Sequence, residues 1–389
     1  MKSSTNLDAN ASHGLLPYVK EQMIAAGFDY LNPSSIHSGG QRARIIVEES
    51  RHEVSKLLGL TDGERVVFTS GATEANNSVV FCRYLDPKIS DAVKKSESFI
   101  VTSELEHPSI LEPCNKLAEL GVGVKFAKPN RAGQIKCDEF YNLVDQDTRL
   151  VSLMYANNET GNIFPIAQIA HEISRNYSAA LIHTDAVQSV GRIDFDFSEL
   201  GVDLMSISGH KLGALTGVGA LIIRAGLEIE PLLYGGPQEK RSRAGTENVL
   251  GIASLGYAAR WLSENKVTQI SKLKINRDKV KSSLLNNFSD VEFNTHEASI
   301  PNTLNVRIPG IKSHDLVVAL DLVGVCLSSG AACASGKPGA SHVLLAMGLD
   351  QEQASESIRI SVKADYEPEE LEHAIDKLVT CITRMKDVR

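Results

Sequence analysis

The sequence predicts an α/β protein in which a large domain, built on a seven-stranded and mainly parallel sheet, is joined to a smaller α/β domain. Two observations predict this class. Between about residues 65 and 224, short apolar or β-branched runs alternate with stretches of helical spacing. Such alternation is typical of a mainly parallel sheet with helices on both sides. From about residue 260 the pattern changes to a long polar-faced helix followed by a few shorter elements, so we expect a second unit there.

Seven strands are predicted in the first segment. Their sequences are nearly continuous apolar runs, as in strands that are buried on both faces. Because ligands of such sheets bind beyond the carboxyl ends of the strands, residues that carry chemistry are expected directly after these runs. The predicted strands are Arg65–Thr69, Phe99–Thr102, Val122–Phe126, Leu150–Met154, Ala180–Thr184, Asp203–Ile207 and Val218–Ile223.

The remainder of the chain predicts the smaller domain. A loop rich in Gly, Ala and Ser, at about residues 327–341, is expected to be mobile because few side chains can pack it. We predict a large domain over residues 15–260, and a small domain over residues 261–389 together with residues 1–14. Within the small domain, helices are expected at 261–288, 313–322 and 367–386, and strands at 303–308 and 357–362.

The composition excludes several classes of function. The 389 residues carry 48 acidic and 40 basic side chains, and the net charge of -8 argues against non-specific binding to nucleic acid. The start of the chain lacks the basic and apolar regions of a signal peptide, and no apolar run approaches the roughly 18 residues of a membrane span. The six cysteines form no C-x-x-C pair and no cluster with zinc-site spacing, so no metal site is expected. A cytoplasmic enzyme is the expected class.

A candidate phosphate-binding turn follows the first predicted strand. Gly71 can take a positive φ, and Ala72 and Thr73 then open a helix. The first amides of a helix are unpaired donors, and together with the helix dipole they favour an anion. Ala72 and Thr73 are therefore candidates for holding a phosphate. An ordinary N-cap turn is the alternative interpretation.

A carboxylate follows another buried run, at Asp185. Such a group is costly in apolar surroundings unless a cation faces it, and the protonated nitrogen of a pyridine ring is one such cation. Gln188 follows three residues later and can donate to a ring oxygen from the same side. A helix N-cap is the alternative interpretation of Asp185.

The sharpest signal is the sequence Ser-Gly-His-Lys at 208–211, directly after a predicted strand. A lysine held in a pocket can form a Schiff base with an aldehyde cofactor, and desolvation lowers its pKa toward the nucleophilic form. Ser208 and His210 flank Lys211 as candidate donors to a phosphate. Without this context a lysine would be ordinary solvated surface. An aldehyde anchor, an acid for a ring nitrogen and a phosphate cup together indicate pyridoxal 5′-phosphate (PLP).

The order and spacing of these motifs resemble the cysteine desulfurases of the NifS/IscS type, in the fold-type I, class V aminotransferase superfamily. The resemblance covers nearly the whole chain. It is carried by segments 32–37, 69–77, 103–111, 157–161, 183–191, 208–211, 243–249, 328–336 and 357–362.

The resemblance implies a role for several residues around the cofactor. It implies that Lys211 is the Schiff-base lysine and that Asp185 is the partner of the pyridine nitrogen. His107 matches a histidine that stacks on the ring and moves protons, for which a pKa near neutral pH is suited. Asn158 matches an asparagine near the ring oxygen, beside Gln188.

The resemblance also implies substrate and subunit contacts. Thr246 matches a threonine that reaches the phosphate of the other subunit, so a homodimer with composite sites is expected. Arg359 matches the arginine that binds the substrate carboxylate, and Asn32 is expected as a second contact. Cys333 matches the loop cysteine that attacks the substrate sulfur and carries it as a persulfide to an acceptor protein. Cys326, inside an apolar run, is expected to be core.

The chain departs from the usual family pattern at four places. The N-terminal segment Asn6–His13 differs from the usual Tyr-Leu-Asp-Asn-Ala-Thr-Thr-like sequence, and residues 212–217 lack the usual Tyr-Gly-Pro-Lys. Ala331 and Ala334 stand where Ser and Thr are usual, and the usual Gly-Arg does not follow Arg359. None of these changes removes a chemical group that PLP chemistry needs. They leave open which sulfur acceptor is served.

We therefore predict a PLP-dependent cysteine desulfurase that converts L-cysteine to L-alanine, in a pathway such as iron–sulfur cluster assembly. A selenocysteine lyase, a cysteine lyase or an aminotransferase on the same scaffold is the first alternative. Cys333 speaks against an aminotransferase, which needs no loop thiol. A non-catalytic partner that keeps the fold for assembly is the second alternative, and the presence of all the candidate catalytic groups speaks against it. Direct nucleic-acid and membrane partners are not expected.

Overall fold

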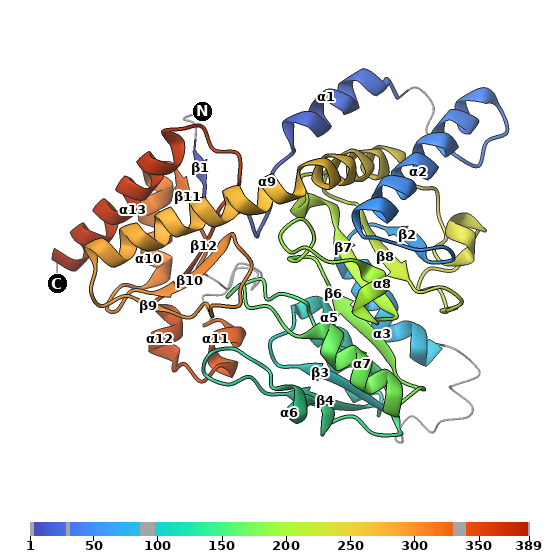
Figure 1. Cartoon of the computed structure of the whole chain (residues 1–389), viewed down its shortest axis with the longest axis horizontal. Helices are drawn as coiled ribbons and strands as arrows, with labels where there is room; N and C mark the ends of the chain where they lie inside the picture. Colours follow the sequence, from blue (N-terminus) through green and yellow to red (C-terminus); the bar gives the residue numbers. More distant parts are fainter. Residues whose placement is uncertain (1–3, 29–31, 86–97, 330–339, 388–389) are drawn as a thin grey trace.

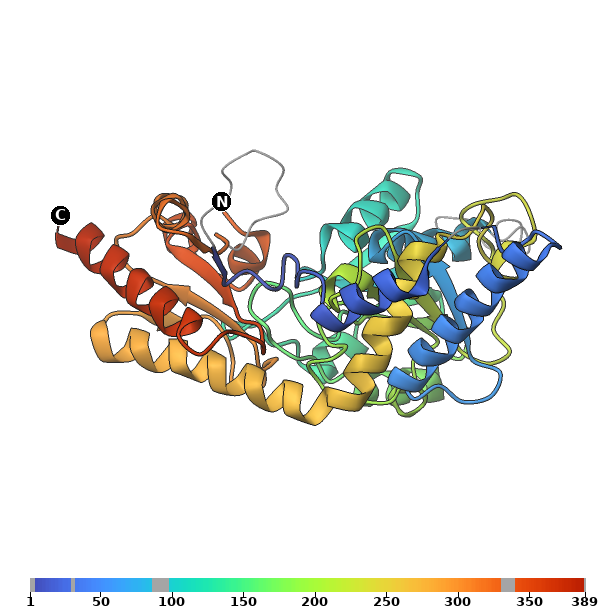
Figure 2. The same ribbon diagram turned by 90° about the horizontal axis from the view of Figure 1, so that it is seen from above.

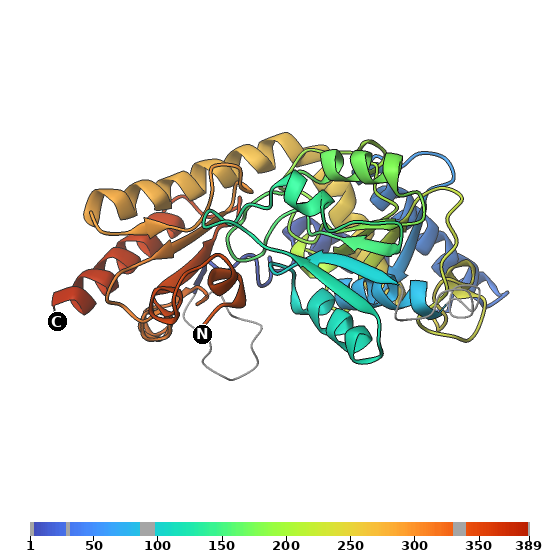
Figure 3. The ribbon, with the colours of Figure 1, turned by 90° about the horizontal axis from the view of Figure 1, so that it is seen from below.

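The computed structural model describes residues 4–28, 32–85, 98–329 and 340–387 of the chain. In this part, two units lie side by side along the long axis of the molecule (Figures 1 and 2). One long helix, α9, runs from the larger unit into the smaller one in both views. Figure 3 shows the same division from below, with the orange and red C-terminal elements gathered at one end.

The larger unit is built on a seven-stranded sheet with the strand order β2-β8-β7-β6-β5-β3-β4. β8 runs opposite to both of its neighbours, β2 and β7, and the other pairings described in this sheet are parallel. The prediction of a seven-stranded, mainly parallel sheet is therefore confirmed, with small shifts at the strand ends. The strands are β2 (Arg65–Thr69), β3 (Phe99–Ser103), β4 (Gly123–Ala127), β5 (Thr148–Ser152), β6 (Leu181–Asp185), β7 (Leu204–Ser208) and β8 (Gly219–Ile223).

Helices cover both faces of this sheet. Successive side chains of a strand point to opposite faces, so each face presents apolar side chains to the helices that cover it. Val67 and Ile100 pack with residues of α3 and α5, whereas their neighbours Val66 and Val101 pack with residues of α2, α7 and α9. Each face therefore has its own apolar core. The helices of this unit are α1 (Pro17–Ala26), α2 (Ser38–Leu57), α3 (Ala72–Leu85), α5 (Pro108–Glu119), α6 (Cys137–Tyr141), α7 (Ile166–Asn176) and α8 (Phe197–Leu200).

The smaller unit has a three-stranded antiparallel sheet of order β12-β10-β9 and a separate hydrophobic core. The N-terminal strand β1 pairs with β11 in parallel, so the start of the chain joins this unit. The strands are β1 (Thr5–Asn6), β9 (Glu292–Phe293), β10 (Thr303–Arg307), β11 (Val325–Cys326) and β12 (Ser357–Ser361). The helices are α10 (Ser313–Leu322), α11 (His342–Ala346), α12 (Gln351–Ser355) and α13 (Glu370–Asp387).

The helix expected over 261–288 is longer than the sequence pattern indicates, because α9 spans Val249–Asn287. The side chain of Asn248 accepts a hydrogen bond from the N–H of Gly251 and caps it. Its first part is buried nearly all round, which hides the helical period that the later, half-exposed part displays. The helix crosses the predicted boundary at residue 260, and the boundary stays a prediction. No described helix combines the length and the apolar character of a membrane span.

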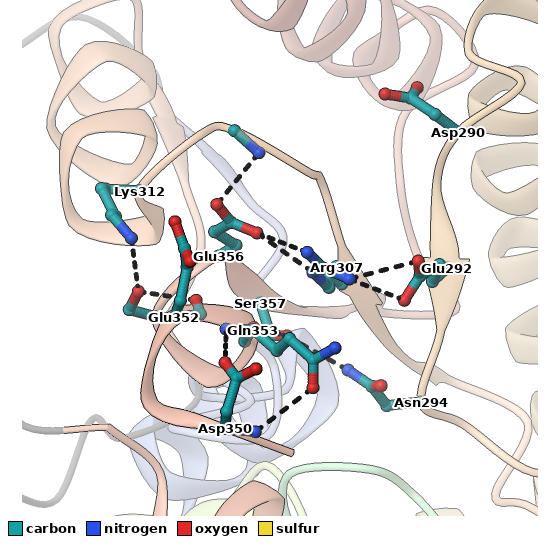
Figure 4. Close-up of polar contacts among 12 residues, drawn as sticks. Asp290, Glu292, Asn294, Arg307, Lys312, Asp350, Glu352, Gln353, Glu356 and Ser357 are labelled. Carbon is teal, nitrogen blue, oxygen red and sulfur yellow. Dashed lines mark hydrogen bonds and ion pairs between the residues drawn. The ribbon is translucent and has the colours of Figure 1, made fainter.

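An ion-pair network holds the start of β12 (Figure 4). Glu356 is 3% exposed, and its Oε2 accepts two hydrogen bonds of 3.0 Å from Arg307. Its Oε1 accepts from the N–H of Gly310 at 3.0 Å, and Arg307 also pairs with Glu292 at 3.1 Å. Because Glu356 directly precedes β12, this network fixes the strand that carries Arg359.

Candidate active site

Most of the predicted site residues follow the carboxyl ends of strands that run in the same direction. His107 follows β3, Asp185 ends β6, and Lys211 lies in a short 3-10 turn directly after β7. The backbone carbonyl of Asn158, after β5, accepts a 3.2 Å hydrogen bond from Arg359 of the smaller unit. The predicted site therefore lies between the carboxyl ends of the strands of the large sheet and strand β12 of the smaller unit.

Asp185 is a buried carboxylate, 6% exposed. Its Oδ2 accepts from Asn76 Nδ2 at 2.7 Å, and its Oδ1 accepts from the N–H of Val187 at 3.0 Å. Within the residues that the structure describes, its partners are neutral donors and not a Lys or Arg side chain. A buried negative charge without a cationic partner is the arrangement that a protonated ring nitrogen would complete.

His107 is held as a neutral imidazole of defined tautomer. Its Nδ1 accepts from the N–H of Ser109 at 3.1 Å, and the hydroxyl of Ser109 lies 2.8 Å away. Because an amide N–H can only donate, Nδ1 carries no proton and the ring proton is on Nε2. Burial lowers the pKa of His107, against the opposing effect of Asp185. The Ser109 hydroxyl also accepts from Asn76 at 2.8 Å, so one asparagine joins the histidine to the carboxylate.

The Lys211 amine and the Gln188 amide meet at one backbone carbonyl. Lys211 Nζ donates to the carbonyls of Asn10 at 2.6 Å and Ala11 at 2.8 Å. Gln188 Nε2 donates to the same Asn10 carbonyl at 3.2 Å, and its Oε1 accepts from Arg192. Because a guanidinium only donates, Arg192 fixes the amide with its Nε2 toward Lys211. Gln188 is thereby fixed as a hydrogen-bond donor, and its contact with a ring oxygen stays a prediction.

The turn that opens α3 offers backbone donors to an anion. The helix begins at Ala72 and has 14 residues, so the N–H groups of its first turn lack helical partners. Thr73 is exposed at this end. A Cβ at Gly219 would lie 2.7 Å from the Cα of Gly71, so β8 can lie directly against the turn because position 219 is glycine.

The last residue of β7 and the turn after it add side-chain donors. Ser208 is 3% exposed, and its hydroxyl is 3.0 Å from Nδ1 of His210. Burial, followed by the nearby Lys211 amine, lowers the pKa of His210 to about 4. The ring is therefore neutral near pH 7, and the ring nitrogen that carries the proton can donate to a phosphate oxygen.

Arg359 is a buried cation in which one nitrogen, Nε, lacks a hydrogen-bond partner among the described residues. It is 3% exposed, and its two Nη atoms donate to Asp8 Oδ1 at 2.6 Å and to the carbonyl of Asn158 at 3.2 Å. In the described part of the chain its Nε is buried without a hydrogen-bond partner. A ligand carboxylate would satisfy this donor.

The hydrogen bonds of the described residues do not join Asn32 to these groups, and the position of Cys333 is not described. Asn32 is exposed, and its Oδ1 accepts from the N–H of Ser34 at 3.0 Å within its own loop. The contacts of the described residues do not bring it to Arg359. Cys333, with Ala331 and most of the predicted loop, lies outside the described residues. Cys326, expected to be core, is half-buried because β11 has only the short strand β1 beside it.

Thr246 is exposed and lines a cavity of about 230 Å³ with Ser70 and other residues of its own chain. The segment before it is held in a strained turn, because residues 239–241 have φ values of 48°, 53° and 69°. The carboxylate of Glu239 holds the turn in place. It accepts from both Nη atoms of Arg51 at 2.9 and 3.0 Å and from the N–H of Phe68 at 3.0 Å.

Four polar residues that the sequence reasoning did not single out support the site. Asn76 and Arg192 lie inside or next to segments that carry the family resemblance, and this nearness to predicted site residues is the signal that could have found them. Asp8 and Asn10 lie in the N-terminal segment that departs from the usual pattern, where no local signal points to them. No group of His, Cys, Asp or Glu among the described residues could hold a metal ion.

An amine, a buried carboxylate and a helix N-terminus at the carboxyl edge of a mainly parallel sheet define a PLP-dependent enzyme of fold type I, and the donor set described above fits that cofactor. The aminotransferase class-V family model matches residues 5–373. The chain belongs to this family, within its group of cysteine desulfurases.

Two curated relatives and one solved structure are similar over nearly the full length. Cysteine desulfurase 2 of Trichormus variabilis is 36% identical over 387 residues, with 99% of this chain and 93% of the relative covered. Cysteine desulfurase IscS of Dictyoglomus turgidum is 36% identical, with 99% and 94% covered. The structure of a NifS-like protein matches with a TM-score of 0.87 at 34% identity, and covers 98% of this chain and 100% of that one.

Proposed function

We propose that this chain is a PLP-dependent cysteine desulfurase that converts L-cysteine to L-alanine and keeps the removed sulfur as a persulfide on Cys333. In the overall change, the thiols of L-cysteine and Cys333 give L-alanine and an S–SH group. The observation that carries the proposal is the placement of Lys211 and Asp185 at the carboxyl ends of neighbouring strands, where Arg359 is joined to the large unit through Asn158. The whole length of the chain is also similar to cysteine desulfurases.

Arg359 is the proposed carboxylate-binding residue. Its buried Nε lacks a partner in the described part of the chain, and the other two nitrogens are already fixed by Asp8 and Asn158. The guanidinium therefore needs no reorientation when the carboxylate arrives. Asn32 is proposed as a second contact and must then leave its present bond to Ser34.

Bound PLP supplies an aldehyde for the amine and a ring that accepts electrons from the substrate. Asp185 holds the proton on the ring nitrogen, and Gln188 and Asn158 are proposed to contact the ring oxygen. His107 has its proton on Nε2, and Lys211 carries an amine that can take up and release a proton, so these two residues are the proposed proton carriers. The phosphate is assigned to the group of donors formed by Ala72, Thr73, Ser208 and His210.

Cys333 is the proposed acceptor of the sulfur, through attack of its sulfur atom on that of the substrate. A free thiol with a pKa near 8.5 is mostly protonated at neutral pH, so the site or the substrate must take up its proton. A sulfur-acceptor protein then receives the persulfide sulfur, with iron–sulfur cluster assembly as the proposed use. We propose a cytoplasmic homodimer, in which Thr246 contacts the phosphate of the partner subunit.

Replacement of the loop thiol tests the proposal. Cys333→Ala is expected to keep the yellow absorbance of the bound cofactor and to lose alanine formation from cysteine. Cys326→Ala is the matched control, because Cys326 belongs to β11 and is not assigned to the chemistry. Full activity of Cys333→Ala would contradict the thiol assignment. A requirement for a stoichiometric α-keto acid in the wild type would indicate an aminotransferase instead.

A further inference from the structure

Asn10 itself has no role in the chemistry described above, yet its backbone carbonyl binds both the Lys211 amine and the Gln188 amide. Asn10 is 1% exposed. Each of its backbone and side-chain polar atoms has a hydrogen-bond partner within the described residues. Because every polar atom of this buried asparagine has a hydrogen-bond partner among the described residues, its position is closely fixed.

The side chain of Asn10 is bound mainly by the smaller unit. Its Nδ2 donates to Thr303 Oγ1 at 2.8 Å and to the carbonyl of Asn158 at 3.2 Å. Its Oδ1 accepts from Asn302 at 2.9 Å, and its backbone N–H donates to Ser361 Oγ at 2.9 Å. Thr303 begins β10 and Ser361 ends β12, so neighbouring ends of both strands hold this residue.

The backbone carbonyl of Asn10 points the other way, into the larger unit. It accepts from Lys211 Nζ at 2.6 Å and from Gln188 Nε2 at 3.2 Å. The next carbonyl, of Ala11, gives the same amine a second acceptor at 2.8 Å. Both acceptors belong to one short segment. A shift of Asn10 would therefore move both acceptors and the lysine amine that they hold.

Two routes connect Asn10 to Arg359. The carbonyl of Asn158 accepts from Asn10 Nδ2 and from Arg359, each at 3.2 Å. Ser361, which binds the backbone of Asn10, lies two residues after Arg359 in β12, so these two side chains share one face of the strand. Asn10 thus joins the guanidinium that is proposed to hold the substrate carboxylate to the amine of Lys211.

We propose that Asn10 is a positioning residue that fixes the Lys211 amine relative to Arg359, and that the carbonyls of Asn10 and Ala11 are the resting acceptors of this amine whenever the lysine is not joined to the cofactor. The inference rests on the proposed function. A shift of about 1 Å in a reacting group can cost about 100-fold in rate. Asn10→Ala is therefore expected to lower kcat for alanine formation by about 10- to 100-fold, with little change in KM.

Asn305 supplies a matched control. It is a fully buried asparagine of β10 whose Nδ2 also reaches the larger unit, at the carbonyl of Glu159. Its hydrogen bonds do not include Lys211 or Gln188. Asn305→Ala therefore removes a comparable bond between the units and leaves the lysine contacts in place.

The experiment compares the two variants in the cofactor-free and in the loaded protein. In the cofactor-free protein, reductive methylation at one fixed pH, read by mass spectrometry, gives the rate at which Lys211 is labelled. The two carbonyl acceptors hold the amine away from the reagent, so Asn10→Ala is expected to raise this rate about fivefold. Asn305→Ala is expected to leave it unchanged and to keep kcat within about threefold of the wild type.

Equal losses of kcat in both variants, with an unchanged labelling rate of Lys211, would show that Asn10 only packs the two units together and would overturn the proposal. If Asn10→Ala does not fold, Asn10→Asp keeps the shape but lacks the two donated bonds, and the same loss of kcat is expected from it. A wild type that forms no alanine would contradict the proposed function, whereas the labelling comparison would still decide the place of the amine.

Discussion

Glu106, the residue before His107, carries a fully buried carboxyl group whose pKa is raised. Its Oε1 accepts from Ser103 Oγ and from the N–H of Met154, both at 2.9 Å, whereas its Oε2 is buried without a partner in the described part of the chain. Burial raises the pKa of Glu106 to about 8, with a further contribution from Asp185. The carboxyl group is therefore neutral over most of the acid and neutral range.

This shift predicts how stability depends on pH. A carboxyl group whose pKa is raised in the folded state stabilises it fully below the ordinary value of 4.5, and this contribution is lost as the pH rises through about 8. The cofactor-free wild type should therefore lose more free energy of unfolding between about pH 5 and about pH 8 than Glu106→Gln does. Urea unfolding at the two pH values measures this, and Glu112→Gln, at an exposed position of α5, is the control. Equal losses in the wild type and Glu106→Gln would contradict the assignment.

The sequence predicts the residues whose chemistry is local and misses those defined by distant contacts. Lys211 and Asp185 follow buried strands directly, so their place at the edge of the sheet can be inferred from the chain order alone. Asn10 is different, because its partners Thr303 and Asn302 lie some 290 residues away in sequence. An asparagine side chain both donates and accepts hydrogen bonds, so a single sequence does not indicate which distant residues it contacts.

Strand β12 depends on the network that precedes it. Glu356 has a side chain that is 4% exposed and accepts from Arg307 and from the N–H of Gly310. Glu356→Gln removes a charge-assisted pair from a buried position, so the free energy of unfolding is expected to fall by about 2 kcal/mol. Chemical denaturation measures this loss.

Glu292 provides the control at the other side of the same guanidinium. Its side chain is 53% exposed, and exposed ion pairs contribute little. Glu292→Gln is therefore expected to cost less than about 0.5 kcal/mol. A loss for Glu356→Gln that is no larger than that of Glu292→Gln would show that the network does not hold β12.

Elements with a clear period are predicted well, and elements with mixed surroundings are not. The predicted helix at 313–322 coincides with α10. The first half of α9 escapes prediction because burial on all sides leaves no polar face in that stretch. The strands β1 and β11 have two residues each and form only by pairing with one another, so no local pattern indicates them.

At the scale of the whole molecule, the proposed dimer predicts complementation between two inactive variants. Lys211→Ala lacks the anchoring amine, and Thr246→Ala lacks the proposed phosphate contact. If Thr246 acts on the partner subunit, a mixed dimer contains one site in which both residues are intact. Co-expression in equal amounts should then restore about one quarter of the wild-type rate of alanine formation.

The opposite result has an equally clear meaning. If Thr246 serves the site of its own chain, no mixed dimer contains a complete site, and the rate stays at the level of the separate variants. A sedimentation measurement on the mixture shows that dimers have formed, so that failure to associate is not mistaken for failure to complement. The exposed position of Thr246 in a single chain is compatible with a contact to a partner.

The tether between the cofactor and the chain is the central claim, and borohydride reduction tests it most directly. Purified protein is incubated with PLP, reduced with borohydride, digested and examined by mass spectrometry for a lysine that carries the reduced cofactor. The account predicts that this lysine is Lys211 and that Lys211→Ala yields no labelled peptide and no yellow colour. Labelling at a different lysine, or none in the wild type, would contradict the account.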